Sequence, residues 1–330
     1  MKSLIVIGAS TGGMQALCTI FSALPADFPA AVLVVTHIGA RVSVLPDILD
    51  QTSALPVRYA QHDEPVRPGR ILMAPPDRHM LVAMQGGQCL IELTRGPKEN
   101  HTRPSIDPLF RSAAAVCGPA VIGVILTGYL DDGTAGAQAI HACGGRLVVQ
   151  QPSDAIAPFM PQSVIDHVQA DQCLPVAQIA AALLALVDAA QPTTLANTSA
   201  PAVTVVENRF ARGAGNMEEL QKIATPSTFT CPECHGALWE LHKQKPRRFR
   251  CHTGHSFTAA ILAELQHEKA EDAIWAAVRA LQEKERLYDS LAVKATAWQH
   301  AGTAIDYAAK AQQAREQAEL LRAVLLRDAA

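Results

Sequence analysis

Over the first 190 residues, short runs of hydrophobic residues alternate with longer segments of mixed polarity. The runs at 4–7, 31–36 and 121–126 are rich in β-branched residues and end at glycine or polar residues, a pattern typical of buried strands. The segments between them predict helices. Repeated strand–helix–strand units require a mainly parallel sheet with helices on both faces. We therefore expect an α/β fold with a doubly wound, mainly parallel sheet.

Two further patterns add a hairpin to this domain and mark its end. Residues 80–84 and 89–94 predict a β-hairpin around two consecutive glycines. A helix over 176–189 ends before a Gln-Pro pair, and the Thr-, Ser-, Asn- and Pro-rich residues that follow predict a linker. The expected boundaries are a domain at 1–190, which carries its own core, and a linker at 191–225.

The last third of the chain predicts a small module at 226–258 and a helical hairpin tail at 259–330. In the tail, hydrophobic residues recur at intervals of three, four or seven, as on one face of an amphipathic helix. These residues are Ile274, Val278, Leu281, Tyr288 and Leu291. Gly302 is expected to separate this helix from a second one at 303–327.

Composition and charge limit the function. The chain has 330 residues, 49% of them hydrophobic, and a net charge of −3. This charge gives no general attraction to nucleic acid, and no apolar run is long enough to span a membrane. The basic residues of 243–250 are expected to form a solvated hairpin face. Because the N-terminus leads directly into the first strand, without a signal peptide, we expect a cytoplasmic protein.

Three cysteines and a histidine in the 226–258 module have the spacing of a zinc site. Cys231 and Cys234 form a C-x-x-C pair, and Cys251 and His255 follow as a C-x-x-x-H pair. Four such ligands predict a closed, structural Cys₃His zinc site in a zinc ribbon. His235 and His252 are the alternative fourth ligands, and we favour His255 because adjacent Cys251 and His252 would chelate awkwardly.

A serine, a histidine and an aspartate each follow the end of a predicted strand. Ser10 lies in Gly8-Ala9-Ser10-Thr11-Gly12, which fits the G-x-S-x-G nucleophile elbow, and His37 follows the strand at 31–36. Asp131 and Asp132 lie in the loop after the strand at 121–126. Parallel strands bring such positions to one edge of the sheet. A Gly-rich turn can also hold phosphate, but no Lys-Ser/Thr pair follows here.

These residues lie in segments that resemble the catalytic domain of the bacterial chemotaxis receptor methylesterases, the protein-glutamate methylesterases. The resemblance covers about residues 3–188. It includes G-A-S-T-G-G (8–13), V-T-H (35–37), A-P-P-D-R-H-M (74–80), R-P-S-I-D-P-L-F (103–110) and V-I-L-T-G-Y-L-D-D-G (124–133).

The resemblance implies a role for each matching residue. Ser10 is implied as nucleophile, His37 as general base and Asp132 as the carboxylate that faces Nδ1 of His37, while Asp131 is expected to be solvated. Thr11 and the backbone at Gly128 and Tyr129 are expected near the oxyanion. Arg103 either pairs locally at a helix start or holds the substrate. Catalysis of this kind needs no cofactor.

The function implied is hydrolysis of glutamyl methyl esters on the cytoplasmic helices of chemoreceptors, with release of methanol, and deamidation of glutamine. Many members of the family carry a receiver domain before the catalytic domain. The present chain begins at the catalytic strand, so we expect control through the C-terminal tail and a regulatory protein that binds it. The alternative is a regulatory interaction module on an esterase-like scaffold. A zinc-ribbon nucleic-acid binder does not fit the charge of the chain.

Overall fold

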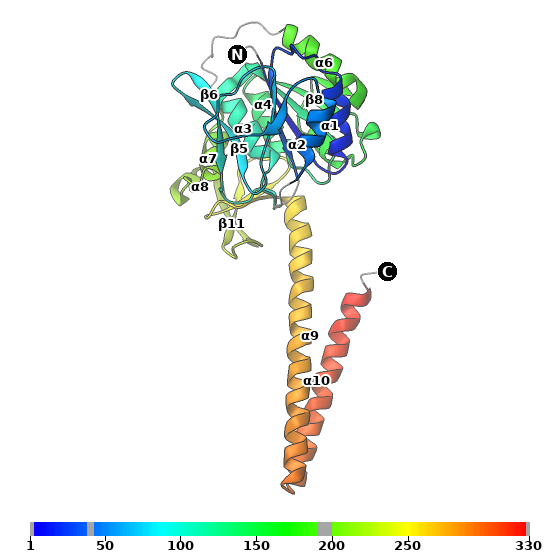
Figure 1. Ribbon diagram of the computed structural model, residues 1–330. Helices are drawn as coiled ribbons and strands as arrows, with labels where there is room; N and C mark the ends of the chain where they lie inside the picture. Colours follow the sequence, from blue (N-terminus) through cyan, green and yellow to red (C-terminus); the bar gives the residue numbers. More distant parts are fainter. Residues whose placement is uncertain (1–2, 38–42, 190–199, 328–330) are drawn as a thin grey trace. The chain divides into compact units, whose positions relative to one another are not determined.

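A computed structural model describes residues 3–37, 43–189 and 200–327 (Figure 1). The chain divides into two compact units, Met1–Ile261 and Leu262–Ala330. The first unit contains every candidate functional residue named above, and the second contains most of the helical tail.

A seven-stranded parallel sheet forms the centre of the first unit, as the hydrophobic runs predict. The strand order is β3-β4-β2-β1-β7-β8-β9, and every described pair of neighbours is parallel. The strands are β1 (Leu4–Ala9), β2 (Ala31–Thr36), β3 (Val57–Tyr59), β4 (Arg70–Met73), β7 (Val121–Ile125), β8 (Arg146–Gln150) and β9 (Gln172–Leu174). The expected α/β class is confirmed.

Helices cover both faces of this sheet (Figure 1). One face packs against α1 (Gly13–Ser22), α2 (Leu45–Thr52) and α6 (Val176–Asp188). The other packs against α3 (Ile106–Cys117), α4 (Thr134–Ala142) and α5 (Phe159–His167). Two 3-10 turns, Gly118–Ala120 and Pro152–Asp154, complete the connections. Successive side chains of a strand point to opposite faces, so β1 contributes Leu4 and Val6 to one core and Ile5 and Ile7 to the other.

The predicted hairpin is present as β5 (His79–Gln85) and β6 (Gln88–Thr94). Gly86 and Gly87 form its turn, with φ of 56° and 77°. Two consecutive residues with positive φ are typical of a tight hairpin turn, where glycine is favoured. Met80, Val82 and Ile91 bury the hairpin against the α3 side of the core.

The structure differs from the predicted linker at 191–225. Residues 190–199 lie outside the described ranges, but α7 (Ala202–Ala211) and α8 (Met217–Ile223) occupy much of the rest. Thr94 donates a hydrogen bond of 2.7 Å to the carbonyl of Ala211, and Phe210 is buried. Thr- and Ser-rich composition favours a linker locally, but contacts with distant residues stabilise helix here instead.

Strands β10 (Ala224–Thr230), β11 (Ala237–Leu241), β12 (Arg248–Cys251) and β13 (Ser256–Thr258) form a four-stranded antiparallel sheet. We refer to β10–β13 as the small sheet. It belongs to the same compact unit as the seven-stranded sheet. The zinc ligands predicted from the sequence all lie in this segment.

The helical tail consists of α9 (Ala259–Ala297) and α10 (Ala301–Arg327), and most of it forms the second unit. The two helices contact each other through stacked Tyr288 and Tyr307 and through a 2.7 Å ion pair between Arg315 and Glu285. The predicted stripe on α9 is its more buried side. The break lies at residues 298–300, whereas Gly302, the predicted separator, is helical. In the described part of the chain, no helix is long and apolar enough to cross a membrane.

Candidate active site and metal-ligand cluster

Ser10 follows the last residue of β1 and precedes α1. Its N–H donates to the carbonyl of Thr127, and its own carbonyl accepts from Gly13. Gly12 has φ of 78°, and a Cβ atom there would lie 2.8 Å from a side-chain carbon of Ile156. Both the backbone conformation and the close approach therefore require glycine. This turn lifts Ser10 to the carboxyl end of the sheet.

His37 connects Ser10 to Asp132. Its Nδ1 lies 3.2 Å from Oγ of Ser10, and its Nε2 lies 2.8 Å from Oδ2 of Asp132. The expectation that Asp132 faces Nδ1 is therefore wrong: Asp132 faces Nε2, and Nδ1 faces Ser10. Since an ionised carboxylate only accepts, Nε2 carries the proton and Nδ1 is free to accept one from the serine hydroxyl.

Asp132 is buried and fully hydrogen-bonded. Besides His37, it accepts hydrogen bonds from the side chains of Asn100 and Ser105 and from the backbone N–H of Ile106, at 2.8–2.9 Å. Burial alone would raise its pKa, but the bond and charge of His37, with the bonds from Ile106 and Asn100, lower the pKa of Asp132 to about 2. The carboxylate is thus kept ionised beside the imidazole.

Asp131 is not solvated, contrary to expectation. It is buried, and its Oδ1 accepts a 2.7 Å hydrogen bond from Oγ1 of Thr258 in β13. Burial raises the pKa of Asp131 to about 6, although the bond from Thr258 acts in the opposite direction. The sequence could not reveal this partner, which lies 127 residues away.

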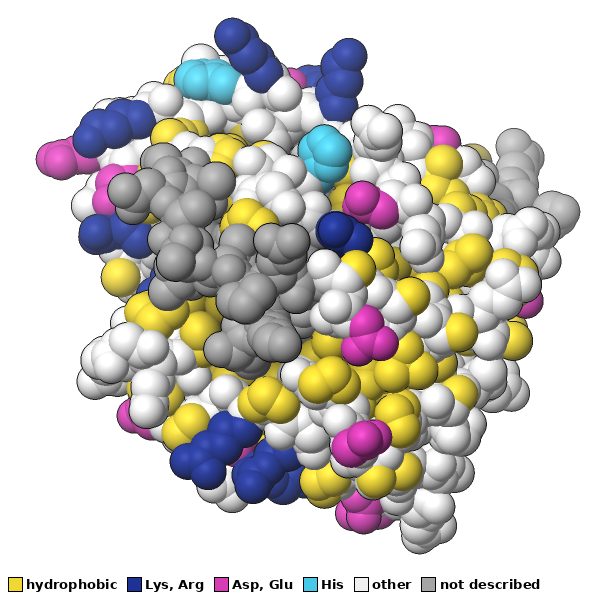
Figure 2. All heavy atoms as spheres, turned by 90° about the horizontal axis from the view of Figure 1, so that it is seen from above, with side chains coloured by type: hydrophobic (Ala, Val, Ile, Leu, Met, Phe, Trp, Pro, Cys, Tyr) yellow, Lys and Arg dark blue, Asp and Glu magenta, His cyan; other side chains and the backbone are white. Residues whose placement is uncertain are grey.

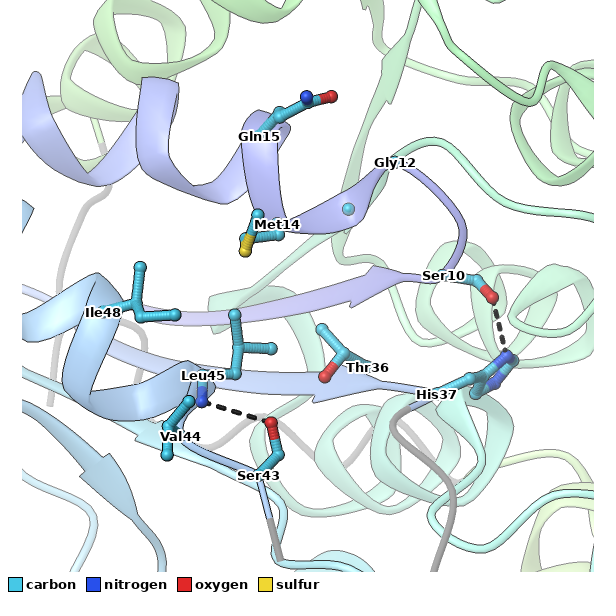
Figure 3. Close-up of a pocket in the computed structure, with 11 residues that line it drawn as sticks. Ser10, Gly12, Met14, Gln15, Thr36, His37, Ser43, Val44, Leu45 and Ile48 are labelled. Carbon is cyan, nitrogen blue, oxygen red and sulfur yellow. Dashed lines mark hydrogen bonds between the residues drawn. The ribbon is translucent and has the colours of Figure 1, made fainter. Parts of the chain in front are cut away.

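A pocket of about 450 Å³ opens beside Ser10 and His37 (Figure 3). It lies between the start of α1 and the start of α2, and Met14 and Ile48 are partly exposed in its wall. The remaining lining residues are Gly12, Gly13, Gln15, Thr36, Ser43, Val44 and Leu45. The pocket thus offers an apolar surface next to the serine hydroxyl.

The residues expected around the oxyanion lie outside this lining. The N–H groups of Thr11 and Tyr129 donate no hydrogen bond to any described residue. In contrast, the N–H of Gly128 donates to the carbonyl of Ala157 at 2.9 Å and is occupied. The Tyr129 side chain stacks on Phe159, with ring centroids 5.5 Å apart.

Arg103 is engaged within the protein. Its guanidinium donates to Oδ1 of Asp77 at 2.6 and 2.8 Å and to the carbonyl of Gly96 at 2.8 Å. Of the two roles that the sequence leaves open for Arg103, these contacts correspond to local pairing.

Cys231, Cys234, Cys251 and His255 form a compact cluster. Their four ligand atoms lie within 4.8 Å of one another, and His235 and His252 are not part of the group. Sγ of Cys251 lies 3.7 Å from Sγ of Cys234 and 3.6 Å from Nδ1 of His255. Bonds of about 2.3 Å to a tetrahedral zinc would place two sulfur ligands roughly 3.7 Å apart. The donor set and its spacing therefore fit zinc.

The basic segment at 243–250 is not a uniformly solvated face. Arg248 and Arg250 are buried and both pair with Glu207 of α7, at 2.8 and 2.7 Å. Arg250 also contacts Glu99, which accepts two bonds from Arg111 of α3.

On the face drawn in Figure 2, described acidic and basic side chains are interspersed with hydrophobic ones.

Sequence reasoning missed the side chains that hold Asp132. Ser105 lies in the R-P-S-I-D-P-L-F segment, so its position there is a signal. Asn100 has no comparable signal, yet its Nδ2 donates to both Asp107 and Asp132. Burial and the nearby Asp132 carboxylate raise the pKa of Asp107 to about 7.

The family model for CheB methylesterase matches residues 5–183, more than half of the chain. A protein-glutamate methylesterase/protein-glutamine glutaminase of Methanosarcina acetivorans is 38% identical over 191 residues, 56% of this chain and 54% of that protein. A protein of the same description from Dechloromonas aromatica is 36% identical over 182 residues, 55% of this chain and 50% of that protein. The chain spans about half the length of these curated relatives.

A solved structure shows the same similarity. The crystal structure of the Thermotoga maritima CheB methylesterase catalytic domain superposes with a TM-score of 0.55 at 37% identity. The match covers 56% of this chain and 98% of that domain.

Proposed function

Because this chain belongs to the CheB methylesterase family, we propose that it is a serine esterase that hydrolyses glutamyl methyl esters of chemoreceptors, and that it also deamidates glutamine. The observation that carries the proposal is the continuous contact from Ser10 through His37 to Asp132, with separations of 3.2 and 2.8 Å. A serine, a base and a buried carboxylate in this order supply the nucleophile and the proton transfers of nucleophilic acyl transfer.

In the first half of the reaction, Oγ of Ser10 attacks the ester carbonyl while Nδ1 of His37 accepts the hydroxyl proton. Asp132 stabilises the imidazolium through its bond to Nε2. The tetrahedral intermediate collapses, the bond to the methoxy oxygen breaks, and Nδ1 returns the proton so that methanol leaves. The glutamyl acyl group remains on Ser10.

In the second half, water attacks the acyl-enzyme and gives its proton to Nδ1 of His37. The ester bond to Oγ breaks, Ser10 regains the proton, and the free glutamate is released. With a glutamine substrate, ammonia replaces methanol as the leaving group. The same residues therefore serve both reactions.

Backbone N–H groups are the proposed oxyanion donors. The N–H groups of Thr11 and Tyr129 have no bond to a described residue, and that of Thr11 lies beside the start of α1. Donors fixed in the protein before the reaction stabilise the developing negative charge without reorganisation. The Gly128 amide is left out of this role because Ala157 occupies it.

The proposed substrate is a methylated helix of the cytoplasmic part of a chemoreceptor, which places the enzyme in the cytoplasm. The partly exposed Met14 and Ile48 beside Ser10 offer a surface on which aliphatic side chains of such a helix can pack. We further propose that the hairpin α9–α10 binds a regulatory protein, since exposed Trp275, Leu287 and Trp298 provide apolar contact area.

The proposed metal is a structural zinc held by Cys231, Cys234, Cys251 and His255. Four ligands complete a tetrahedral shell, so the ion would supply folding free energy to the small sheet. No cofactor takes part in the proposed reaction.

The test of the proposed function is methanol release from a methylated receptor fragment. The wild-type chain should release methanol and leave free glutamate, and Ser10→Ala should reduce the rate by about 10⁴-fold or more. Circular dichroism should show that the variant is folded. A variant that keeps more than about a tenth of the wild-type rate would contradict the role of Ser10.

A further inference from the structure

Asn100 connects two buried carboxylates. Its side-chain N–H₂ donates to Oδ1 of Asp132 at 2.8 Å and to Oδ2 of Asp107 at 2.9 Å. The amide has two hydrogens, so one is available for each carboxylate. Asn100 is itself buried. Its position therefore fixes the side of Asp132 that faces away from His37.

The backbone of Asn100 is held by the small sheet. Its N–H donates to the carbonyl of Ser256 in β13 at 2.8 Å, and the N–H of Ser256 donates to the carbonyl of Lys98 at 3.3 Å. Asn100 and His101, with φ of 53° and 62°, are the central residues of a tight turn that backbone hydrogen bonds of 3.0 and 3.3 Å between Glu99 and Thr102 close. The turn sets the backbone conformation of Asn100, and the hydrogen bonds with Ser256 attach this turn to β13.

The neighbouring side chain, Glu99, is held by the same sheet. It pairs with Arg111 of α3 at 2.7 Å and with Arg250 of β12 at 3.1 Å, and all three groups are buried. Arg250 also donates to the carbonyl of Gly254 at 2.7 Å, within the loop between Cys251 and His255. The segment that carries Asn100 is thus bound to β12, to β13 and to the loop of the metal-ligand cluster.

We propose that Asn100 is a positioning residue for Asp132 and that the small sheet holds Asn100 in place, so that the esterase site is complete only when this sheet is docked. The proposal rests on the proposed esterase function for its catalytic readout. Asn100 acts through Asp132 and His37 and touches neither the substrate nor Ser10.

The first experiment replaces the amide and leaves the backbone free to keep its conformation. Asn100→Gly removes both side-chain hydrogen bonds, while glycine tolerates positive φ. His101→Gly is the matched control, because the neighbouring His101 has φ of 62° and an exposed side chain directed to Glu233. Steady-state methanol release should show kcat lowered about 10–100-fold in Asn100→Gly with KM within about twofold, and His101→Gly should match the wild type.

A second readout does not depend on the substrate. The proton on Nε2 of His37, bonded to Asp132, should give a downfield proton NMR signal. We expect the signal to shift or disappear in Asn100→Gly and to remain in His101→Gly, with circular dichroism unchanged in both. An unchanged signal and an unchanged kcat in folded Asn100→Gly would overturn the positioning role.

A double-mutant cycle tests the part played by the small sheet. Arg250→Met removes the link to Glu99. Arg247→Met is its control, since the exposed Arg247 pairs with Glu240 and lies over the ring of Phe249. If the sheet acts through Asn100, Arg250→Met should weaken the NMR signal and lower kcat in the wild-type background and add little to Asn100→Gly. Fully additive effects would overturn the coupling.

If Arg250→Met does not fold, Arg250→Lys replaces it in the cycle, because lysine keeps the charge but cannot bridge Glu99, Glu207 and Gly254 together. A different outcome separates this proposal from the esterase proposal. If the wild type releases no methanol, the proposed function fails, while the NMR signal still reports whether Asn100 and Arg250 position the His37–Asp132 pair.

Discussion

Oγ1 of Thr258 donates a 2.7 Å hydrogen bond to Asp131, the residue directly before Asp132. The two adjacent carboxylates therefore have different partners: Asp131 bonds to the small sheet, and Asp132 bonds to His37. Substitutions at these two positions should separate a structural role from a catalytic one.

Asp132→Asn should lower kcat by about 10⁴-fold, because an amide opposite Nε2 can stabilise the wrong imidazole tautomer. Asp131→Asn should keep kcat within about threefold at pH 7, since its amide oxygen can still accept from Thr258. Methanol release by both variants measures the ranking. A larger loss in Asp131→Asn would show that Asp131, rather than Asp132, is the catalytic carboxylate.

The stability of the protein should depend on the ionisation of Asp131. Its pKa in the folded state is about 6, above the ordinary 3.8, so its contribution is full below pH 3.8 and is lost as the pH rises through 6. Asparagine cannot ionise. The free energy of unfolding of Asp131→Asn should therefore gain roughly 2–3 kcal/mol relative to the wild type between pH 4 and pH 8.

Urea unfolding at several pH values measures this difference, and Thr258→Val provides a second check. Removing the Thr258 hydroxyl removes a bond that lowers the pKa of Asp131, so the loss of stability should extend to higher pH. A difference between wild type and Asp131→Asn that does not change with pH would refute the prediction.

Gly12→Ala should destabilise the protein by roughly 2–4 kcal/mol and reduce esterase activity, because the new Cβ atom adds a contact with Ile156 to the strain of positive φ. Gly69→Ala is the control: Gly69 has a similar φ of 73°, and nothing lies within 4 Å of the added atom. The cost of the contact should be absent there, so that the strain of positive φ alone destabilises the protein by roughly 1 kcal/mol. Equal losses in urea unfolding would show that the contact with Ile156 is relieved.

The purified chain should contain one zinc ion, and Cys251→Ser should lose it. Because metal binding contributes folding free energy, amide hydrogen exchange should then increase in residues 224–258 and remain slow in β1 and β7. Cys173→Ser is the control, since Cys173 is exposed and lies outside the cluster. Zinc retained in Cys251→Ser, or none in the wild type, would contradict the proposed site.

Truncation should distinguish the two units, and it also tests the expectation that residues 1–190 form a domain with its own core. A chain ending at Ile261 keeps the whole first unit and should hydrolyse a small methyl ester at the wild-type rate. A chain ending at residue 190 lacks Arg250, Ser256 and Thr258 and should lose most activity, because Glu99, Asn100 and Asp131 lose their partners. Comparing the small ester with whole receptor measures what α9–α10 adds to recognition.

The hydrophobic pattern predicted the parallel sheet, the hairpin and the two tail helices because each depends mainly on its own sequence period. It did not predict α7 or the buried Arg248 and Arg250. A lysine- and arginine-rich segment is solvated unless acidic partners cover it, and those partners, Glu207 and Glu99, lie 41 and 151 residues away. The same holds for the site. Ser10 and His37 could be predicted because each directly follows a strand, whereas the surroundings of Asp131 and Asp132 are made by residues distant in the sequence.

The link between Ser256 and Asn100 also has a consequence for biosynthesis. Domains begin to fold from the N-terminus while the chain is still being made. Ser10, His37 and Asp132 leave the ribosome well before Ser256, so the nascent chain can form the parallel sheet before the small sheet exists. If the docked sheet completes the site, the enzyme becomes active only late in its own synthesis, and an incomplete chain remains inert toward the esters it meets.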